Sequence, residues 1–438
     1  MENYFSFDGS TDACCKVNNI SNDNNEIYLN NSNSKIPRGS GLSPRLLSAK
    51  TDFEVIRNNN NKLLEINKIE KTIRVSSNVT LMEINKFSFN YGLELPVISH
   101  PKVQVGGAIA CCVHGKNQYL YDFGDNIYSI KLLLHNNELI YCNANNNKLI
   151  YDLTIGGYGS TGLILEAELK LIEVKNTCIQ RSRNRINNLK EITKNYNDNN
   201  IINLHGIFSW HDLHGGDKKF GSGFEYRDEK INPIIIDMPN NYGLDNTIES
   251  NKVSKYYSIG NFIFGKKFNS LYKIKENFSG SKRIINSYGG EFTSKNIYWN
   301  IMRSSGFIEV QLIVPFDKFD EFSNFIKFNI KKFNAKTSVC ITKASKGIRK
   351  YLRFSGNGVN IDIAGIKNEN NYYFFSEINK FCRLYSAIPN ISKCSILKKE
   401  IIISSYGEQC ALFYSDYKKA LGKNPPEWFL NVGYLDKY

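Results

Sequence analysis

Alternation of apolar and polar positions organises the first 180 residues of the chain. Residues 62–76 alternate around an Asn-Lys-Ile-Glu-Lys turn and predict two strands. Helical spacing of apolar residues follows from Leu81 to Phe89. Residues 126–142 place two β-rich runs about an Asn-Asn turn and predict a hairpin. The stretch 149–175 has an apolar lead, a glycine turn and a final alternating strand, which closes a first unit of strands and helices.

The second half has a different texture, in which strand-like runs alternate with helical stretches. The predicted strands are 203–213, 221–227, 306–315, 337–344 and 357–366. The predicted helices are 186–197, 316–333 and 374–387. This order predicts an antiparallel sheet with helices on one side.

The pattern predicts an α+β protein with four parts. Residues 1–35 form a polar, Asn/Ser-rich lead-in with one short element, and a domain spans 36–177. A second domain spans 178–387. The tail, 388–438, contains a strand at IPNISKC, a helix and a Pro-Pro break.

The charge balance favours an anionic partner. The 438 residues include 56 Lys and Arg against 42 Asp and Glu, a formal charge of +14. The basic residues are scattered, mostly Lys, with no Arg/aromatic run and no zinc-finger spacing, so nucleic acid is not the expected partner. An anionic small molecule or an acidic membrane face fits better.

The cysteines and the N-terminus indicate a reducing compartment. None of the ten cysteines forms a Cys-x-x-Cys pair, so free thiols and no metal site are expected. The first 17 residues lack a basic region followed by an apolar core, so no secretory signal is expected. No apolar run approaches about 18 residues, and we expect no transmembrane helix. The expected location is cytoplasmic.

Three glycine-bearing segments carry the candidate chemistry: PRGSGLS at 37–43, VGGAIACCVHG at 105–115 and IGGYGSTG at 155–162. Glycine lets main-chain N–H groups crowd together and lets a ligand approach without a Cβ in the way. Successive exposed N–H groups form a nest that suits a pyrophosphate. None of the segments matches the dinucleotide fingerprint or the phosphate-binding P-loop.

With these segments in order, the chain resembles the FAD-linked oxidases of the vanillyl-alcohol oxidase type, which carry a PCMH-type FAD-binding domain. Within them it is most similar to the decaprenylphosphoryl-ribose 2-oxidase branch, whose VGGAIA-x-x-x-HGKN motif stands here as Val105 to Asn117. Residues 123–134 and 154–164 resemble the flavin domain, whereas 208–227 and 307–322 resemble the substrate domain.

The resemblance implies a two-subdomain FAD-binding domain at 36–177, a substrate domain at 178–387 and a C-terminal segment that returns to the FAD domain. It implies FAD as the cofactor, with the paired glycines against its pyrophosphate and His114 beside the isoalloxazine. The implied cofactor-binding residues are Arg38, Gly39, Ser40, Gly41, Leu42, Ser43, Gln104, Val105, Gly106, Gly107, Cys111, Cys112, Val113, His114, Gly159, Gly162 and Ile164.

Lys393, Gln311 and His114 are the implied catalytic residues. The ammonium of Lys393 would bind the substrate hydroxyl, offset charge on the reduced flavin, or act as a base if desolvation lowers its pKa. Gln311 falls where the family has a strand glutamine facing the flavin. Lys116 is a candidate partner for a substrate phosphate.

The chain departs from the family pattern at several positions. Leu42 replaces the histidine that bonds covalently to flavin in several relatives, so FAD is expected to bind non-covalently. Asn360 stands where the branch has a cysteine, and Asn390 stands where it has a tyrosine, which reshapes the pocket wall. Asp362 remains in register. Asn360, Asp362 and Asn390 complete the candidate substrate residues.

These observations predict an FAD-dependent oxidoreductase that oxidises a sugar hydroxyl by hydride transfer to flavin N5. A polyprenyl-phosphate-linked pentose or glycan precursor is the candidate substrate, and the basic surface suits peripheral membrane association. An aldonolactone oxidase and a flavin-binding protein without turnover stay open as alternatives. A reductase or another electron acceptor is a candidate partner.

Overall fold

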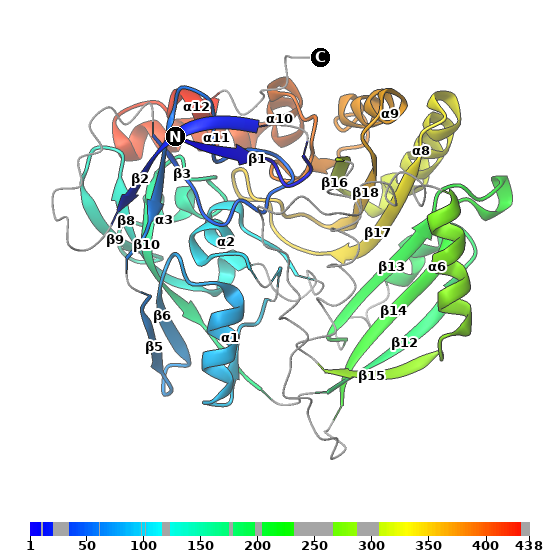
Figure 1. Cartoon of the computed structure of the whole chain (residues 1–438), viewed down its shortest axis with the longest axis horizontal. Helices are drawn as coiled ribbons and strands as arrows, with labels where there is room; N and C mark the ends of the chain where they lie inside the picture. The colour runs from blue at the N-terminus through cyan, green and yellow to red at the C-terminus, as the bar shows by residue number, and fades with distance from the viewer. Residues whose placement is uncertain are drawn as a thin grey trace.

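The structure is a computed structural model that describes residues 1–9, 12–20, 35–60, 62–97, 99–100, 102–115, 123–174, 178–197, 204–231, 266–286 and 306–430. It contains helices together with mainly antiparallel sheets, which confirms the α+β class. Figure 1 shows the two principal sheets side by side, with the N-terminal strands and the C-terminal helices above the first.

The N-terminus builds a small sheet in the order β1-β2-β4-β3. Its strands are β1 (Glu2–Phe5), β2 (Asp12–Ile20), β3 (Lys35–Pro37) and β4 (Glu54–Asn58), and β4 pairs in parallel with both β2 and β3. A single short element was expected in the polar lead-in. Two strands form instead, because Tyr4, Ala13 and Cys15 bury one face against Val55.

A five-stranded antiparallel sheet, in the order β5-β6-β10-β8-β9, forms the core of the first unit. The strand and helix predictions for 62–89 and the hairpin at 126–142 are confirmed. Thr80 is the N-cap of α1 and forms a capping box with Glu83. The Thr80 side chain accepts a hydrogen bond from the backbone N–H of Glu83, and the Glu83 side chain accepts one from the backbone N–H of Thr80. The elements are β5 (Leu64–Asn67), β6 (Thr72–Ser76), α1 (Leu81–Phe89), β8 (Ile127–Leu134), β9 (Leu139–Asn143), α3 (Lys148–Thr154) and β10 (Gly162–Lys170), with β7 (Leu93–Glu94) and β11 (Ile172–Glu173) paired beside them.

The second glycine segment is a short helix rather than a turn. Helix α2 spans Val105–Cys111 and begins after Gln104. Val105, Ala108 and Ile109 are fully buried in the core of this unit. The spacing of these three apolar residues is therefore helical. The two glycines lie in the first turn of the helix, where other parts of the chain approach closely.

The second unit is an eight-stranded antiparallel sheet in the order β15-β12-β14-β13-β17-β18-β16-β19. The five predicted strands are confirmed within a few residues, whereas β12, β15 and α6 were not predicted. The strand IPNISKC is confirmed only for its first two residues. The strands are β12 (Cys178–Ile186), β13 (Gly206–Asp212), β14 (Ser222–Ile231), β15 (Lys282–Asn286), β16 (Phe307–Val314), β17 (Thr337–Ser345), β18 (Gly358–Ile366) and β19 (Ile388–Pro389).

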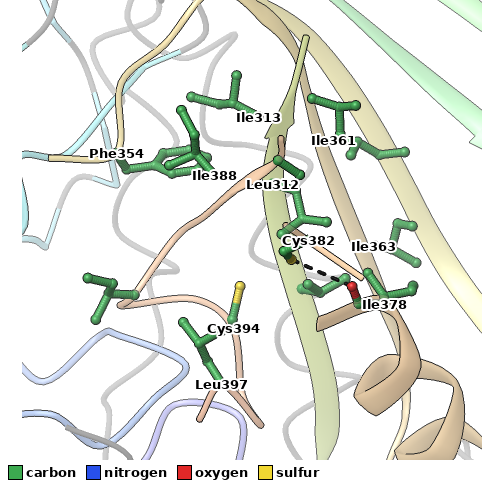
Figure 2. Close-up of a cluster of buried hydrophobic side chains, with 14 of the residues drawn as sticks. Leu312, Ile313, Phe354, Ile361, Ile363, Ile378, Cys382, Ile388, Cys394 and Leu397 are labelled. Carbon is green, nitrogen blue, oxygen red and sulfur yellow. Dashed lines mark hydrogen bonds between the residues drawn. The ribbon is translucent and has the colours of Figure 1, made fainter. Parts of the chain in front are cut away.

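Helices cover one face of this sheet. Helices α4 (Glu191–Tyr196), α8 (Phe319–Phe333) and α9 (Glu369–Lys380) contribute buried side chains to the same core as β16 and β18. Figure 2 shows part of it, where Leu312 and Ile363 lie near Ile378 and Cys382. The opposite face of the sheet carries α6 (Lys266–Phe278) at one end. The rest of this face is not covered by α4, α8 or α9.

The C-terminal helices contact the first unit. They are α10 (Lys399–Tyr406), α11 (Glu408–Leu421) and α12 (Glu427–Leu430). The Tyr417 hydroxyl on α11 donates to the carbonyl of Ser160 at 2.7 Å. The buried Arg45 donates to the carbonyl of Leu397 at 2.8 Å. These bonds join the end of the chain to the segments that carry the first and third glycine motifs.

Candidate functional site

A cavity of about 1440 Å³ lies between the first unit and the free face of the eight-stranded sheet. It exceeds the roughly 300–1,000 Å³ typical of small-molecule sites, as a dinucleotide together with a substrate would require. All three glycine segments line one side of the cavity, and side chains from seven strands of the sheet line the other.

The first glycine segment lines the cavity along its whole predicted length, from Arg38 to Ser43. The guanidinium of Arg38 lies 4.3 Å from the ring centre of Tyr4, and that of Arg57 lies 5.0 Å from the same ring. Burial, together with the charge of Arg57, lowers the pKa of Arg38 to about 10. The buried Nε atoms of both arginines find no hydrogen-bond partner among the described residues. Two adjacent cations that line the cavity suit a diphosphate.

Helix α2 brings its glycines to the cavity wall. A Cβ on Gly106 would lie 3.1 Å from Cβ of Ser77, whereas a Cβ on Gly107 would meet no protein atom within 4 Å. The N–H of Gly106 donates to the Ser77 carbonyl at 2.9 Å. This amide is therefore not part of the expected phosphate nest. The glycine at 106 serves close packing, and the one at 107 leaves space in the cavity.

The third segment shows why its glycines are needed. Gly159 has φ +82°, and its Cβ would lie 3.4 Å from the ring of Pro37. Gly162 has φ +149°, and its Cβ would lie 2.1 Å from the carbonyl oxygen of Leu133. A side chain would strain the backbone at Gly159, and at Gly162 it would also clash with the main chain of Leu133. Both glycines and Ile164 line the cavity.

Most of the predicted cofactor-binding residues reach the cavity. Gln104, Cys111, Cys112, Val113 and His114 line it, whereas Val105 lies in the core instead. All ten cysteines, each in a described part of the chain, are free thiols. Burial raises the pKa of Cys111 to about 11, so its thiol stays protonated at neutral pH.

Strand register places a row of functional side chains on the cavity face of the sheet. Gln311 on β16 pairs with Asp362 on β18, which pairs with Ile341 on β17. Ile341 in turn pairs with Trp210 on β13. Directly paired residues share a face, and so do residues two apart, which adds Glu309 and Lys343 to this face.

A chain of hydrogen bonds joins the two sides of the cavity. His114 Nε2 lies 2.9 Å from Gln311 Oε1, and Gln311 Nε2 donates to Asp362 Oδ2 at 3.2 Å. Lys393 Nζ donates to Asp362 Oδ2 at 2.9 Å and to Glu309 Oε1 at 3.1 Å. Four strands and loops that are distant in sequence therefore meet at one polar cluster.

Asn390 fixes the orientation of Gln311 within this cluster. Asn390 Nδ2 donates to Gln311 Oε1 at 2.6 Å, while Gln311 Nε2 faces the Asp362 carboxylate. With Oε1 thus an acceptor, His114 must carry its proton on Nε2 to bond with it. Burial, followed by the charges of Lys343 and Lys393, lowers the pKa of His114 to about 3. The imidazole is neutral near pH 7.

The pKa values of the two acidic residues in the cluster differ from those of ordinary carboxyl groups. Burial, and then the charge of Asp362, raises the pKa of Glu309 well above its usual value. Burial also acts to raise the pKa of Asp362, but Lys393 and the hydrogen bonds from Glu309 and Lys393 outweigh it and lower that pKa. Burial would lower the pKa of Lys393, yet the two carboxyl groups raise it above its usual value.

The predicted catalytic and substrate residues separate into two groups. Lys393, His114, Asp362 and Asn390 line the cavity. Gln311 and Asn360 are buried on the cavity side of the sheet without lining it. Lys116 lies outside the described residues.

Sequence reasoning missed Glu309, Lys343 and Arg57, all of which line the cavity. The available signal was strand alternation. Glu309 lies two residues before Gln311 and so shares its face, and Lys343 ends a predicted strand. Without knowledge of which face meets the glycine segments, these residues were indistinguishable from outward-facing polar side chains.

The far end of the cavity is aromatic and basic. Trp210 lies 4.5 Å from Tyr272 of α6, and Phe208 stacks on Tyr226 at 5.0 Å, measured between ring centres. The Arg181 guanidinium lies 5.0 Å from the Phe208 ring and is held by Asp228 through two bonds of 2.6 Å. Such a wall suits a sugar or another group with both apolar and polar edges.

Comparison with known proteins agrees with this geometry. Residues 28–143 match the family model described as FAD binding domain. The chain therefore carries an FAD-binding domain. The expected resemblance to FAD-linked oxidases is confirmed, and the residues around the cavity fit the diphosphate and flavin of that cofactor.

Three curated relatives show the range of similarity. The chain is 24% identical over 283 residues to decaprenylphosphoryl-beta-D-ribose oxidase of Mycolicibacterium smegmatis, which covers 61% of this chain and 60% of the relative. It is 27% identical over 161 residues to the mitochondrial L-galactono-1,4-lactone dehydrogenase of Brassica oleracea, 36% of this chain and 26% of that protein. It is 29% identical over 126 residues to Delta(24)-sterol reductase of Arabidopsis thaliana, 28% of this chain and 22% of that protein. The chain thus matches less than two thirds of the length of each.

Proposed function

We propose that the protein is an FAD-dependent oxidoreductase that oxidises a secondary or lactone-ring hydroxyl of a sugar. The observation that carries the proposal is the polar cluster of Lys393, Asp362, Glu309 and Gln311 facing the FAD-binding segments across one cavity. His114 spans the two sides through its 2.9 Å bond to Gln311. When bound, FAD supplies the hydride acceptor, and the protein supplies the placement of the hydroxyl and the route for its proton.

The cluster residues divide the remaining work. Lys393, 26% exposed in its side chain, presents an ammonium that can donate to the hydroxyl oxygen of a substrate. Neutral His114 and the oriented Gln311 hold the cofactor side of the cluster in place without adding charge. By donating to Gln311 Oε1, Asn390 keeps the Gln311 amide in the orientation that the hydrogen bonds of the cluster require.

Non-covalent FAD is part of the proposal. Leu42 lines the cavity and packs near Phe7 and Phe307, and an alkyl side chain cannot bond to the flavin ring. The purified protein should be yellow, and acid precipitation should release all flavin absorbance into the supernatant. Flavin that stays with the precipitate would contradict this.

The substrate class rests on two observations. The mycobacterial relative is named for a decaprenylphosphoryl-ribose, and the aromatic end of the cavity, which Lys275 and Arg283 also line, supports a phosphorylated sugar. Two of the plant relatives are named for L-galactono-1,4-lactone, and the match to them supports an aldonolactone as the second candidate. Because Asn390 and Asn360 depart from the pattern of the ribose-oxidase branch, both substrate classes should be tested.

The deciding experiment adds candidate substrates to the yellow protein without oxygen and follows loss of flavin absorbance. Polyprenyl-phosphate pentoses, free pentoses and L-galactono-1,4-lactone form the panel, with Trp210→Ala as a variant that removes part of the aromatic wall. Bleaching by a sugar or lactone supports an oxidoreductase and identifies its class. If dithionite reduces the flavin but none of the sugars or lactones does, the remaining alternative is a flavin-binding protein without turnover.

Peripheral membrane association completes the proposal. Among the described residues, no helix has the length and apolarity needed to cross a bilayer. Helix α6, which borders the cavity, exposes Leu271, Ile274 and Phe278 at helical spacing, with Phe278 89% exposed. Exposed basic residues flank this stripe, namely Lys267, Lys275, Lys282 and Arg283. An apolar stripe with basic flanks suits an anionic lipid surface.

Vesicle sedimentation tests the association. Vesicles of phosphatidylglycerol should retain the protein more than vesicles of phosphatidylcholine, and Ile274→Ser with Phe278→Ser should lower retention. Phe328→Ser, which changes an exposed phenylalanine on α8, is the matched control. Equal retention of all three proteins would contradict the assignment to α6.

A further inference from the structure

Glu309 and Asp362 form a carboxyl pair buried beside the cavity. Glu309 is 1% exposed and the Asp362 side chain is 14% exposed, and one ammonium, Lys393, donates to both. The two carboxyl groups therefore lie on either side of one Nζ atom, with Glu309 Oε1 and Asp362 Oδ2 as its acceptors. Asp362 is the member that the cavity reaches more freely, and Glu309 lies behind it on the neighbouring strand.

The hydrogen-bond inventory of the pair favours a shared proton. Glu309 Oε2 is buried and meets no donor among the described residues, because Lys393 serves only Oε1. Two ionised carboxylates that share one ammonium would repel each other strongly away from water. A proton between Glu309 and Asp362 removes both problems, and the raised pKa of Glu309 agrees with it.

The same geometry argues against Lys393 as the base. Its ammonium donates to two carboxyl groups at 2.9 and 3.1 Å, which stabilises the charged form. Loss of that proton would also leave the carboxyl pair without its cation. Lys393 therefore acts as a fixed positive charge and a hydrogen-bond donor.

We propose that the Glu309–Asp362 carboxyl pair, and not Lys393, takes the hydroxyl proton of the substrate as its hydride leaves. The inference rests on the proposed function. The C–H hydrogen of the substrate would leave as a hydride that carries both electrons of the C–H bond, and bound FAD would supply its acceptor. The O–H bond would break with its electrons staying on oxygen, so that a carbon–oxygen double bond forms, and its proton would pass to Asp362 and be shared with Glu309. Asp362 touches the substrate, whereas Glu309 is a positioning residue that acts through Asp362.

The titratable groups around the pair come from two further segments. Lys343 on β17 acts on Asp362, whereas Cys340 of the same strand lies in the core on the opposite face of the sheet. In the segment after β19, Cys394 lies near Glu309, and Lys393 lies between the two carboxyl groups. His114 is neutral near pH 7 and adds no charge. The raised proton affinity therefore belongs to the carboxyl pair, and its fully ionised form is the base.

The pH dependence of flavin reduction tests the proposal. In the wild-type holoenzyme, the anaerobic reduction rate with the sugar or lactone that bleaches the flavin should rise with pH through the raised pKa of the pair. Glu309→Gln should slow reduction about tenfold or more and abolish the rise with pH, since general bases contribute roughly 10²–10⁴-fold. Asp362→Asn should slow it about a hundredfold or more.

Matched variants separate a chemical role from a structural one. Glu94→Gln changes another buried carboxylate with a lysine partner, Lys230 at 2.9 Å, outside the cavity lining, and should keep the wild-type profile. Glu309→Asp should restore the pH-dependent rise. A Glu309→Gln enzyme that is slower at every pH but keeps the wild-type profile would overturn the proposal.

A measurement without substrate keeps this test apart from that of the proposed function. The absorbance of oxidised, bound flavin should shift with pH as the pair titrates in the wild type, and the shift should vanish in Glu309→Gln. A wild-type spectrum that stays constant over the whole pH range in which the protein remains folded would overturn the carboxyl pair itself. If the shift is present but no sugar or lactone reduces the flavin, the proposed function fails and the base role fails with it, while the shared proton stands.

Discussion

The two walls of the cavity are built by opposite means. The FAD-binding wall offers main chain and small side chains, with glycines at 107, 159 and 162 where a larger residue would fill space or strain the backbone. The sheet wall offers charged and polar side chains, and Lys393, Asp362 and Glu309 hold one another in place there. The FAD-binding wall depends largely on the space that its glycines leave beside Arg38 and Arg57, and the sheet wall depends on side-chain chemistry, so substitutions should fail differently on each.

The largest effect is expected on the sheet wall, from Lys393→Met. Removing the ammonium leaves the carboxyl pair buried without its cation, and breaking such a buried pair costs about 3–5 kcal/mol. Flavin reduction by substrate should be lost. Chemical denaturation and anaerobic reduction measure the two effects.

The double variant Lys393→Met with Glu309→Gln is the control for that loss. It should recover part of the unfolding free energy, because one buried acid is removed along with the cation. Equal stability of the single and double variants would show that Lys393 and Glu309 are not coupled.

On the FAD-binding wall, Gly107→Leu should weaken FAD binding about a hundredfold, or about 2.7 kcal/mol, while the fold is retained. The added side chain projects into the cavity, where a Cβ meets no protein atom within 4 Å. Flavin titration and circular dichroism measure the two outcomes. Gly216→Leu, at an equally open position outside the cavity lining, should bind FAD normally.

Arg38→Met should weaken FAD about tenfold, or about 1.4 kcal/mol, because one of two cations near the expected diphosphate is lost. The affinity of the wild type should also fall with salt more steeply than that of the variant. Titration at two ionic strengths distinguishes this from a packing effect, which would leave the salt dependence unchanged.

The smallest effect is expected from buried histidines, which occur in both units of the molecule. Burial lowers the pKa of His114 to about 3 and the pKa values of His135 and His211 to about 4. The unfolded chain binds protons below about pH 6.5 while the folded protein does not, so stability falls as pH decreases from 6.5. Replacing any one of the three by Gln should remove about 1 kcal/mol of the loss between pH 6.5 and 5.5. Thermal unfolding at both pH values provides the measurement, and an unchanged loss in all three variants would contradict it.

Much of the fold was accessible from local pattern. The hairpin at 126–142, the helix from Leu81 and the five strands of the second sheet follow from alternation and helical spacing. Strand β12 was missed because CIQRSRNRI carries few apolar residues, and its inward arginines are satisfied only by partners such as Asp228. Helix α2 was read as a turn because its paired glycines disfavour a helix, while burial of Val105, Ala108 and Ile109 favours it.

The candidate site was predicted unevenly for the same reason. His114, Lys393 and the glycine segments came from motif resemblance, and they line the cavity. Glu309 and Lys343 came only from the structure, because strand alternation gives two faces and does not say which face meets the cofactor-binding segments. Val105 was assigned to the cofactor but is fully buried in the core.

The sequence alone determined the elements and the positions where glycine is required, because hydrophobic periodicity and backbone freedom are local properties. It also determined that the chain has a histidine, a lysine and a glutamine in motifs typical of an FAD-linked oxidase. Only the tertiary structure decided that Glu309 and Asp362 meet at one lysine, Lys393, which donates to both. Proton affinity in such a cluster depends on distances and burial among residues more than 80 positions apart along the chain, as the bond between Glu309 and Lys393 illustrates.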